Sequence, residues 1–377
     1  MQTNKTIVPN QTIGIIGGGQ LGRMMAIAAR YMGYRIAVLD PTPNCPTAQV
    51  ADTQITAAYD DMDAIKRLTD ISDVVTYEFE NVDLQAASYI ESCGKLPQGS
   101  YALEVTQNRE KEKRTIKDLK LSTPVFEIVT NAKECEESLK KFDFPVVIKT
   151  CRGGYDGKGQ LKLNSQADVE EAKEFAEKHQ HCIIEEWIQF DKEISVVFSR
   201  SQSGEIANFP ISENEHRDHI LYKTMAPARI SVEVQIKAYE AARLLAEKMN
   251  IVGTFAIEMF VKGEDIYLNE MAPRPHNSGH YTIEACNISQ FGQHVRAICG
   301  LPLAKIRQFK PAIMLNILGK DMETVIEAMQ QKNEGFVHLY GKKEAKEKRK
   351  MGHITYIGDT FDEVSAQMEK CKETINN

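Results

Sequence analysis

A glycine-rich segment, KTCRGGYDGKGQ at 149–160, follows a short apolar run. It combines four glycines with three cations: Gly153, Gly154, Gly157 and Gly159, with Lys149, Arg152 and Lys158. Glycine lets a loop fold its N–H groups inward around phosphate oxygens, and the cations neutralise their charge. No G-K-[ST] enters a helix, so this is not a Walker A loop. A plain surface hairpin is the alternative, but it would not require four entropically costly glycines. The segment predicts a phosphate-binding loop.

Two glutamates are spaced to face each other across a β-hairpin. Strands are expected at 254–261 and 266–270, and a turn centred near Glu264 sets Glu258 opposite Glu270. Facing carboxylates on apolar strands repel and lose hydration, and a divalent cation removes both problems. Such oxygen ligands suit Mg²⁺, and Asn269 offers a neutral oxygen beside them. A turn shifted by one residue, or one glutamate pointing to solvent, would break the pair.

Three polar side chains lie in the segment MAPRPHNSGH at 271–280. Its prolines disfavour helix and central strand, so Arg274, His276 and Asn277 are expected on an irregular segment beside the carboxylates. Arginine can hold an anion through two parallel hydrogen bonds. The alternative for His276 is a structural loop histidine.

Two further segments carry weaker signals. Glu185 to Ile188 ends a strand and Glu193 follows, so a strand edge could read an adenine and one carboxylate could take ribose hydroxyls. An ordinary amphipathic strand pair is the favoured interpretation from the residues alone. Lys342 to Lys350 is by default a solvated charged loop, and a phosphate-docking loop is the alternative.

A second glycine pattern, Gly17-x-Gly19-x-x-Gly22, lies between an apolar run and a helical stretch, and Asp40 ends the next apolar run. This is the dinucleotide fingerprint, in which the acid binds a ribose, and it favours a nicotinamide-binding oxidoreductase. The fingerprint is weak by itself. The same turn suits any anion, or only close packing of helix on strand.

These residues need two kinds of element to position them. Strands at 12–16, 35–39 and 73–77 alternate with helices, which predicts a parallel sheet of α/β type, and a helix is expected from Thr106, as its N-cap, to Leu119. An α+β region follows, with strands at 125–129, 145–150, 182–186, 193–199, 206–211, 254–261 and 266–270 and helices near 132–141, 167–179 and 233–249. A small C-terminal lobe has strands near 312–318 and 353–357 and helices near 322–330 and 360–374. We therefore expect domains at 1–108, 109–302 and 303–377.

Composition excludes several classes of function. The chain of 377 residues has a net charge of −7, so nucleic acid is not an expected partner. No apolar run approaches the roughly 20 residues that span a bilayer, so no membrane partner is expected. The polar N-terminus does not suit a signal peptide, and the eight scattered cysteines predict reduced thiols in a cytoplasm.

Taken together, the motifs resemble those of the ATP-grasp superfamily, and their exact sequences resemble those of the N5-carboxyaminoimidazole ribonucleotide synthase family. The resemblance rests on GGGQLGRM (17–24), LDP (39–41), TYEFENV (76–82), RGGYDGKGQ (152–160), NEMAPRPHNSGH (269–280) and RKMGHIT (349–355). It covers nearly the whole chain. It implies an ATP-grasp fold with an N-terminal Rossmann-like domain and a small C-terminal lobe.

The resemblance also implies a reaction in purine biosynthesis. ATP and bicarbonate would carboxylate the exocyclic amine of 5-aminoimidazole ribonucleotide through carboxyphosphate, giving ADP and phosphate. Mg²⁺ would be the metal, and a homodimer would be the usual assembly. The alternatives are an ATP-grasp ligase that uses formate or an amino acid, the oxidoreductase, and a non-catalytic nucleotide-binding module.

Site residues follow from the resemblance position by position. ATP phosphates would contact Arg109, Lys149, Gly154, Tyr155, Asp156, Gly157, Lys158, Gly159 and Gln160. Adenine would lie against Glu185, Glu186, Trp187 and Ile188, with ribose at Glu193 and further nucleotide contacts at His216, Asn269 and Glu270. Mg²⁺ would bind Glu258 and Glu270. The ribotide and the chemistry would involve Gln20, Leu21, Glu78, Tyr155, Asp156, Arg274, His276, Asn277, Lys342, Arg349 and Lys350.

The glycine turn at 17–22 would thus face a ribonucleotide substrate and not NAD. One departure from the family pattern is visible, because Glu347-Lys348 stands where the family often has Pro-Gly. That change bears on the geometry of the loop that carries Lys342.

Overall fold

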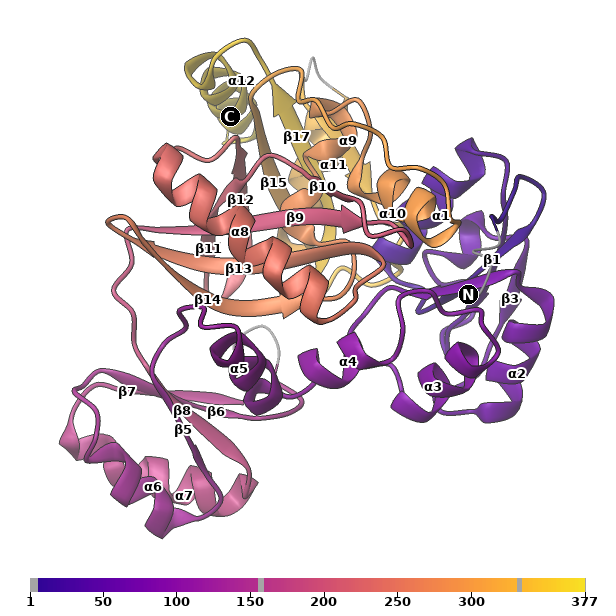
Figure 1. The fold of residues 1–377 in the computed structure, drawn as a ribbon. Coiled ribbons are helices and arrows are strands. Elements are labelled where there is room, and N and C mark those ends of the chain that lie inside the picture. The colour runs from indigo at the N-terminus through magenta and orange to yellow at the C-terminus, as the bar shows by residue number, and fades with distance from the viewer. Residues whose placement is uncertain (1–5, 155–158, 331–333, 377) are drawn as a thin grey trace.

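A computed structural model describes residues 6–154, 159–330 and 334–376 of the chain. The chain first forms a parallel sheet with strand order β3-β2-β1-β4. Its strands are β1 (Thr12–Ile16), β2 (Arg35–Leu39), β3 (Thr53–Ile55) and β4 (Val74–Tyr77). Helices α1 (Gln20–Tyr31), α2 (Met62–Ile71) and α3 (Leu84–Ser92) flank this sheet at the right of Figure 1. The predicted βαβαβ order is confirmed, and the short edge strand β3 was missed.

Two short helices replace the one expected from Thr106 to Leu119. Helix α4 (Tyr101–Thr106) ends at the predicted N-cap, and α5 (Arg109–Asp118) begins after Asn108. The Asn108 side chain accepts a backbone N–H of the first turn of α5, so Asn108 is the true N-cap. Thr106 was the wrong choice because its hydroxyl donates to a carbonyl four residues back, inside α4.

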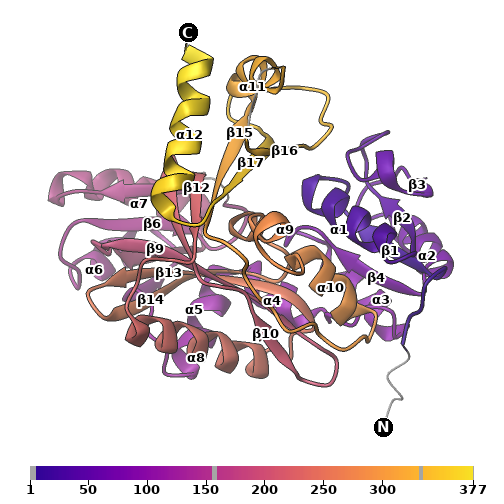
Figure 2. The ribbon, with the colours of Figure 1, turned by 90° about the horizontal axis from the view of Figure 1, so that it is seen from above.

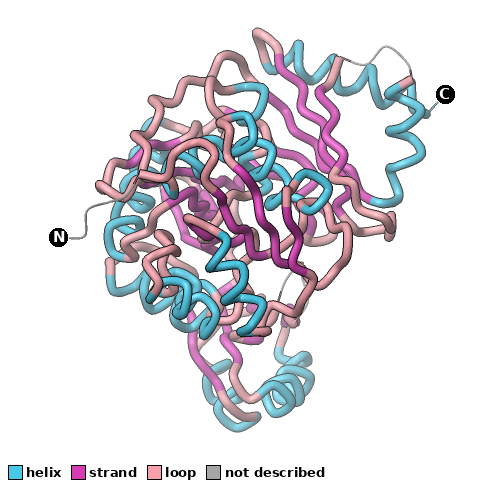
Figure 3. Tube along the Cα trace, turned by 90° about the vertical axis from the view of Figure 1, so that its right-hand side faces the viewer, coloured by secondary structure: helices cyan, strands magenta, loops and turns pink. Residues whose placement is uncertain are grey.

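A four-stranded antiparallel sheet follows, in the order β5-β8-β6-β7. Its strands are β5 (Phe126–Val129), β6 (Val146–Thr150), β7 (Gln160–Leu163) and β8 (Cys182–Glu186), and helices α6 (Ala132–Leu139) and α7 (Val169–His179) cover one face. Figures 1 and 3 show this unit projecting from the rest of the molecule. Lys149 on β6 pairs with Gln160 on β7, so adjacent strands hold the two ends of the glycine-rich loop.

The largest sheet runs in the order β14-β13-β9-β11-β12-β15-β17-β16, with β10 paired to β9. Its first members are β9 (Lys192–Arg200), β10 (Ile206–Asn208), β11 (Ser212–Arg217), β12 (Ile220–Ala226), β13 (Gly253–Lys262) and β14 (Asp265–Ala272). The expected strand at 206–211 was wrong beyond Asn208, and β11 and β12 were not foreseen. Charged and polar residues make up most of β11, so the sequence offered no apolar run there.

Side chains on β9 and β13 alternate between two apolar layers, as the period of a strand requires. Phe255 and Ile257 pack toward α8 (Val232–Lys248), whereas Ala256 packs with Tyr281 on the opposite face. Glu258 continues the alternation of Ala256 and therefore lies on the face away from α8. That face carries the irregular segment after β14, with η3 (Asn277–Gly279), α9 (Thr282–Ala285) and α10 (Gln290–Ile298).

The C-terminal strands extend the large sheet. They are β15 (Ala312–Leu318), β16 (Phe336–Leu339) and β17 (Lys350–Ile357), and β15 pairs with β12. Helices α11 (Met322–Met329) and α12 (Phe361–Asn376) accompany them, and Figure 2 shows this part standing out from the body. The division at 108 and 302 stays a prediction. Among the described residues, no helix has the length and apolar content to cross a membrane.

Candidate active site

A cleft of about 430 Å³ lies where the small sheet, the large sheet and the end of β4 converge. Most residues predicted for the site line it: Arg109, Lys149, Gly154, Gln160, Glu185, Glu186, Trp187, Ile188, Glu193, His216, Glu258, Asn269, Glu270, Arg274, His276, Asn277 and Lys350. Six predicted residues do not line it: Gln20, Leu21, Glu78, Gly159, Lys342 and Arg349. Tyr155, Asp156, Gly157 and Lys158 lie outside the described residues.

Glu258 stands directly opposite Glu270, as predicted, but a β-bulge that the sequence analysis did not foresee produces this pairing. The hairpin turn is Gly263-Glu264, with Lys262 paired to Asp265, and this register alone would set Glu258 opposite Asn269. A bulge intervenes, because Met259 pairs with Leu268 and the next pair is Glu258 with Glu270. Asn269 is the extra residue. The predicted turn centre at Glu264 was therefore slightly wrong, and the bulge restores the predicted pair.

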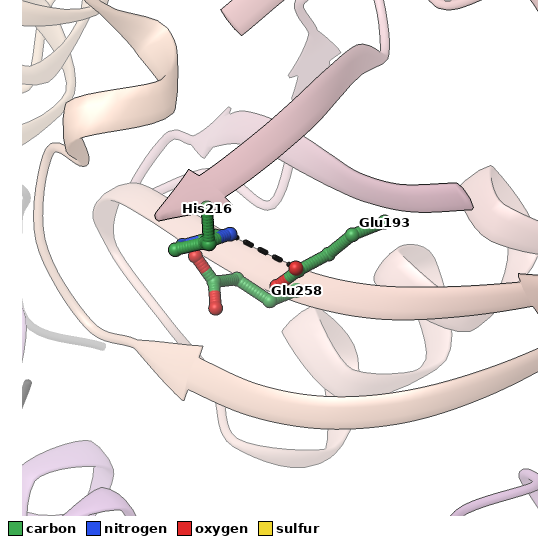
Figure 4. Close-up of side chains that lie close together, drawn as sticks. All are labelled: Glu193, His216 and Glu258. Carbon is green, nitrogen blue, oxygen red and sulfur yellow. Dashed lines mark ion pairs between the residues drawn. The ribbon is translucent and has the colours of Figure 1, made fainter. Parts of the chain in front are cut away.

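Glu258 belongs to an acidic cluster with Glu193 and His216, whose candidate ligand atoms all lie within 4.8 Å of one another (Figure 4). His216 Nδ1 is 2.9 Å from Glu193 Oε2, and His276 Nε2 is 3.5 Å from Glu258 Oε1. Burial, helped by the nearby Glu193 and Glu270, raises the pKa of Glu258 to about 8. A buried carboxyl whose ionisation is opposed by other carboxylates is a favourable place for a cation.

Lys149 is held at the opposite side of the cleft by a buried ion-pair network. Its Nζ lies 2.5 Å from Glu185 Oε2, while Lys113 Nζ lies 3.2 Å from Glu185 Oε1. Burial by itself would raise the pKa of Glu185, but the two ammonium groups lower it to about 2. Arg109 Nη1 lies 3.7 Å from Glu270 Oε2. The carboxylates of Glu185 and Glu270 are therefore paired with three cations, Lys113, Lys149 and Arg109.

The irregular segment after β14 is fixed by contacts from distant parts of the chain. Arg274 Nε donates to Glu80 Oε2 at 2.5 Å, and Asn277 exchanges amide hydrogen bonds with Asn316 on β15. Burial, with the Arg274 charge, lowers the pKa of His276 well below its ordinary value, so His276 is neutral in this environment. The segment therefore presents a guanidinium and a neutral imidazole to the cleft.

Aromatic and apolar side chains form the remaining wall of the cleft. Phe190 and Phe260 stack with ring centroids 4.6 Å apart, and Lys162 Nζ lies 3.9 Å above the Trp187 ring. Glu186 N–H donates to the Val125 carbonyl, which ties the β8 strand end to the preceding segment. Flat apolar surfaces beside strand-end backbone suit a planar heterocycle.

The glycine turn at 17–22 has its anion position filled by the protein itself. Glu78 accepts the N–H groups of Gly19 and Gly22, the latter at 2.7 Å. Asp40 is buried and accepts from Gly18 N–H at 2.7 Å and from the Tyr59 hydroxyl at 2.6 Å. A dinucleotide would need the N–H groups of the turn for its pyrophosphate and the Asp40 carboxylate for its ribose. Both are engaged within the protein, so the structure does not favour the nicotinamide interpretation.

The loop that departs from the family pattern keeps a tight turn. Arg349 N–H donates to the Lys346 carbonyl at 2.8 Å, which closes a turn around Glu347-Lys348 without a positive φ at either. Lys342 Nζ donates to the Lys350 carbonyl at 2.7 Å, and of these cations Lys350 lines the cleft.

Sequence reasoning missed several residues of this site, among them Glu80, Gln107, Glu112, Lys113 and His219. Glu80 stands two residues after Glu78 in TYEFENV, but both lie beyond the end of β4 at Tyr77, so strand alternation gives no guide to where Glu80 points. The helix 109–118 carries many charged residues, and only burial separates Glu112 and Lys113 from the rest. The signal available was a mostly charged helix that the chain also places beside an apolar sheet.

Family models match three successive parts of the chain. They describe a ribonucleotide synthetase preATP-grasp domain at residues 10–107, an ATP-grasp domain at 114–291 and a phosphoribosylaminoimidazole carboxylase C-terminal domain at 312–367. With the fold and the cleft described above, these matches define the chain as an ATP-grasp protein, and the predicted fold class is confirmed.

Comparison with individual proteins shows which ATP-grasp family the chain belongs to. The chain is 47% identical over 362 residues to the N5-carboxyaminoimidazole ribonucleotide synthase of Bacillus subtilis (strain 168), covering 96% of this chain and 95% of the relative. The same enzyme of Staphylococcus aureus (strain MRSA252) is 41% identical over 359 residues, covering 95% of each chain. The chain therefore belongs to the N5-carboxyaminoimidazole ribonucleotide synthase family, as its motifs predicted.

Solved structures agree. An ADP complex of an N5-carboxyaminoimidazole ribonucleotide synthetase matches with a TM-score of 0.95 and 50% identity, covering 99% of this chain and 98% of that one. The synthase of Aspergillus clavatus, in complex with ADP and 5-aminoimidazole ribonucleotide, matches with a TM-score of 0.89 and 31% identity, covering 98% and 99%.

Proposed function

We propose that this chain catalyses the ATP- and bicarbonate-dependent carboxylation of 5-aminoimidazole ribonucleotide, a step of purine biosynthesis. The product is N5-carboxyaminoimidazole ribonucleotide, with ADP and phosphate. One observation carries the proposal: a single cleft unites facing carboxylates, Lys149 at the start of a glycine-rich loop and the Arg274 segment, in a chain of this family.

The chemistry of the cleft walls supports a position for ATP. In this proposal adenine lies against Glu185 to Ile188 and Glu193 takes the ribose, and all of these residues line the cleft. The phosphates face Arg109, Lys149 and the loop at 154–160, with further contacts from His216, Asn269 and Glu270. We propose that this loop closes over ATP and protects it from water.

The carboxylates fit a magnesium ion. Glu258 and Glu270 are opposite each other and supply the hard oxygen ligands that Mg²⁺ prefers, and Glu258 lies where burial disfavours uncompensated negative charge. Mg²⁺, when bound, neutralises charge on the ATP phosphates during transfer. Glu258 and Glu270 would hold it, and Asn269 lines the same cleft.

Bicarbonate is a poor electrophile, so it must first be phosphorylated. Its oxygen attacks the γ-phosphorus of ATP, ADP leaves, and carboxyphosphate forms. The exocyclic amine of the ribotide then attacks the carbonyl carbon of carboxyphosphate, or CO₂ released from it; phosphate leaves and the nitrogen loses a proton. Arg274, oriented by Glu80, holds the anionic reactants, and positioning with charge neutralisation does most of the catalysis.

The ribotide is proposed to lie between the first and last parts of the chain. Its contacts are assigned to Gln20, Leu21, Glu78, Tyr155, Asp156, Arg274, His276, Asn277, Lys342, Arg349 and Lys350. Lys350 is the strongest of these for the 5′-phosphate because it lines the cleft. A homodimer and a cytoplasmic location remain predictions, and light scattering of the purified protein tests the first.

An ADP-release assay tests the function. We expect rapid ADP release with Mg·ATP, bicarbonate and 5-aminoimidazole ribonucleotide together, and a rate at least about tenfold lower when the ribotide is omitted. Formate and free amino acids serve as alternative acids. Ribotide-independent turnover, or turnover triggered by one of those acids, would contradict the proposal.

A further inference from the structure

The outer edge of β14 is held by two neighbouring residues of α5, just where the strand bulges. Lys113 Nζ donates to the Asn269 carbonyl at 2.9 Å and to the Leu268 carbonyl at 3.3 Å. Glu112 Oε1 accepts the Met271 N–H at 2.6 Å. These contacts stand immediately before and after Glu270.

An edge strand presents N–H and C=O groups that no neighbouring strand satisfies. At this bulge the ladder to β13 is also interrupted, because Asn269 has no partner there. The α5 side chains therefore supply hydrogen bonds at the point where β14 could most easily slip by one residue. Such a slip would set Asn269 opposite Glu258 and move Glu270 to the other face.

Lys113 also links this edge to the phosphate side of the cleft. Its Nζ lies 3.2 Å from Glu185 Oε1, and the other oxygen of Glu185 holds Lys149. The Lys113 and Glu185 side chains are 1% and 2% exposed, so neither has water as an alternative partner. A buried charge in this setting holds its partners tightly, because losing one leaves the other charge unpaired.

We propose that Glu112 and Lys113 are positioning residues, which fix the β14 bulge so that Glu270 meets Glu258 in the geometry that magnesium requires. Neither residue is a metal ligand. The inference rests on the proposed function for the identity of the metal, and it adds that the metal site is built from α5 as well as from the hairpin.

Metal-dependent nucleotide binding tests this inference independently of carboxylation. The chain has a single tryptophan, Trp187, and it lines the cleft, so its fluorescence reports on ADP. Mg²⁺ is titrated into the full-length protein at fixed ADP. Lys113→Met is expected to raise the half-saturating Mg²⁺ concentration by about tenfold or more, the usual effect of losing support for metal ligands.

Lys111→Met is the matched control, because Lys111 lies on the same helix and pairs with Glu104 at a half-exposed position. It should leave the Mg²⁺ titration unchanged. Glu112→Gln keeps an oxygen for the Met271 N–H and should stay close to the parent protein, whereas Glu112→Ala should raise the Mg²⁺ requirement. If Lys113→Met does not fold, the comparison of Glu112→Gln with Glu112→Ala tests the proposal by itself.

A purely structural role would weaken every property together. The proposal requires a selective effect. The KM for 5-aminoimidazole ribonucleotide should stay within about twofold of the parent protein in both variants, and metal-free ADP binding should do so in Glu112→Ala, because Lys113 also supports Lys149 through Glu185. Equal Mg²⁺ requirements in Lys113→Met, Glu112→Ala and the parent protein would overturn it, as would failure of Glu112→Gln to rescue. Absence of ribotide-dependent ADP release would instead overturn the proposed function and leave this titration interpretable.

Discussion

Two glycine-rich turns in this chain follow strands and expose backbone N–H groups, yet they have different partners. At 17–22 the N–H groups are taken by Glu78, which stands 56 to 59 residues further along the chain. At the 152–160 loop, Gly153 and Gly154 line the cleft beside Lys149. A methyl group built onto Gly153 would meet nothing within 4 Å, whereas one on Gly17 would lie 2.4 Å from Glu78 Cγ.

The comparison shows that glycine spacing predicts a turn and not its occupant. Both turns satisfy the same local requirement, close approach to an anion. In the first, a carboxylate of the protein supplies the anion and ties β4 to α1. In the second, cations surround the opening and an external phosphate is the natural partner. Distant residues therefore decide which of two similar motifs becomes a binding site.

The largest loss of activity is expected from a substitution in the cleft, beside the second of these turns. Glu270→Gln removes half of the carboxylate charge opposite Lys149 and Arg109, so ADP release should fall by on the order of 10²–10³-fold. Steady-state rates with saturating substrates measure this. Glu264→Gln, in the turn of the same hairpin, is the control and should be nearly neutral. A Glu270→Gln rate within about twofold of the parent protein would contradict the metal role.

Lys149→Met should have the next largest effect. Loss of a cation beside the transferred phosphate should raise the KM for ATP by about 10–100-fold, the range for one hydrogen bond to a charged group. Lys141→Met, at an exposed position paired with Glu127, provides a control with the same change of side chain. An unchanged KM would mean that the glycine-rich loop has no phosphate partner.

Glu78→Ala tests the other turn. The substitution leaves the Gly19 and Gly22 N–H groups without their acceptor, so the free energy of unfolding should drop by about 2–4 kcal/mol. Urea denaturation measures the drop. Sulfate should restore more stability to this variant than to the parent protein, since an anion can replace the carboxylate at the α1 N-terminus. A sulfate response equal to that of the parent protein would show that the turn does not bind anions.

The smallest effect concerns pH. The pKa of Glu258 is raised from 4.5 to about 8, so the folded protein favours its protonated form. Protonated Glu258 therefore contributes to the free energy of unfolding of the ligand-free protein at low pH, and this contribution is lost as pH rises toward about 8. Tm should fall over that window, and less steeply in Glu258→Gln. Some slope should remain, because burial and Glu270 also raise the pKa of Glu112 to about 8. Identical slopes in both proteins would contradict the assignment.

Much of this site could be predicted because its motifs are local. The strand ending at Lys149, the glycines after it and the hairpin glutamates are each contained within about twelve residues. Alternation and turn chemistry then suffice to place them.

What could not be predicted depends on long-range contacts. The bulge at Asn269 leaves no mark in the sequence, and Lys113 and Glu112 look like ordinary residues of a charged helix. Strand β11 was missed because its charged side chains, Glu213 and Glu215, form ion pairs with cations on the sheet surface and leave no apolar run. Strand β12 is mostly apolar, and the sequence analysis did not assign it. Nothing local shows that the Glu78 carboxylate accepts the N–H groups of Gly19 and Gly22, and its assignment to the ribotide stays a prediction.

The most direct test is a crystal structure of the protein with Mg²⁺ and ADP. The account predicts an ion between Glu258 and Glu270, within the roughly 2.0–2.1 Å that Mg²⁺ requires of its oxygen ligands, and ADP phosphates beside Lys149 under the glycine-rich loop. Well-ordered ADP with the two carboxylates turned apart, and with no ion bound to either, would contradict it.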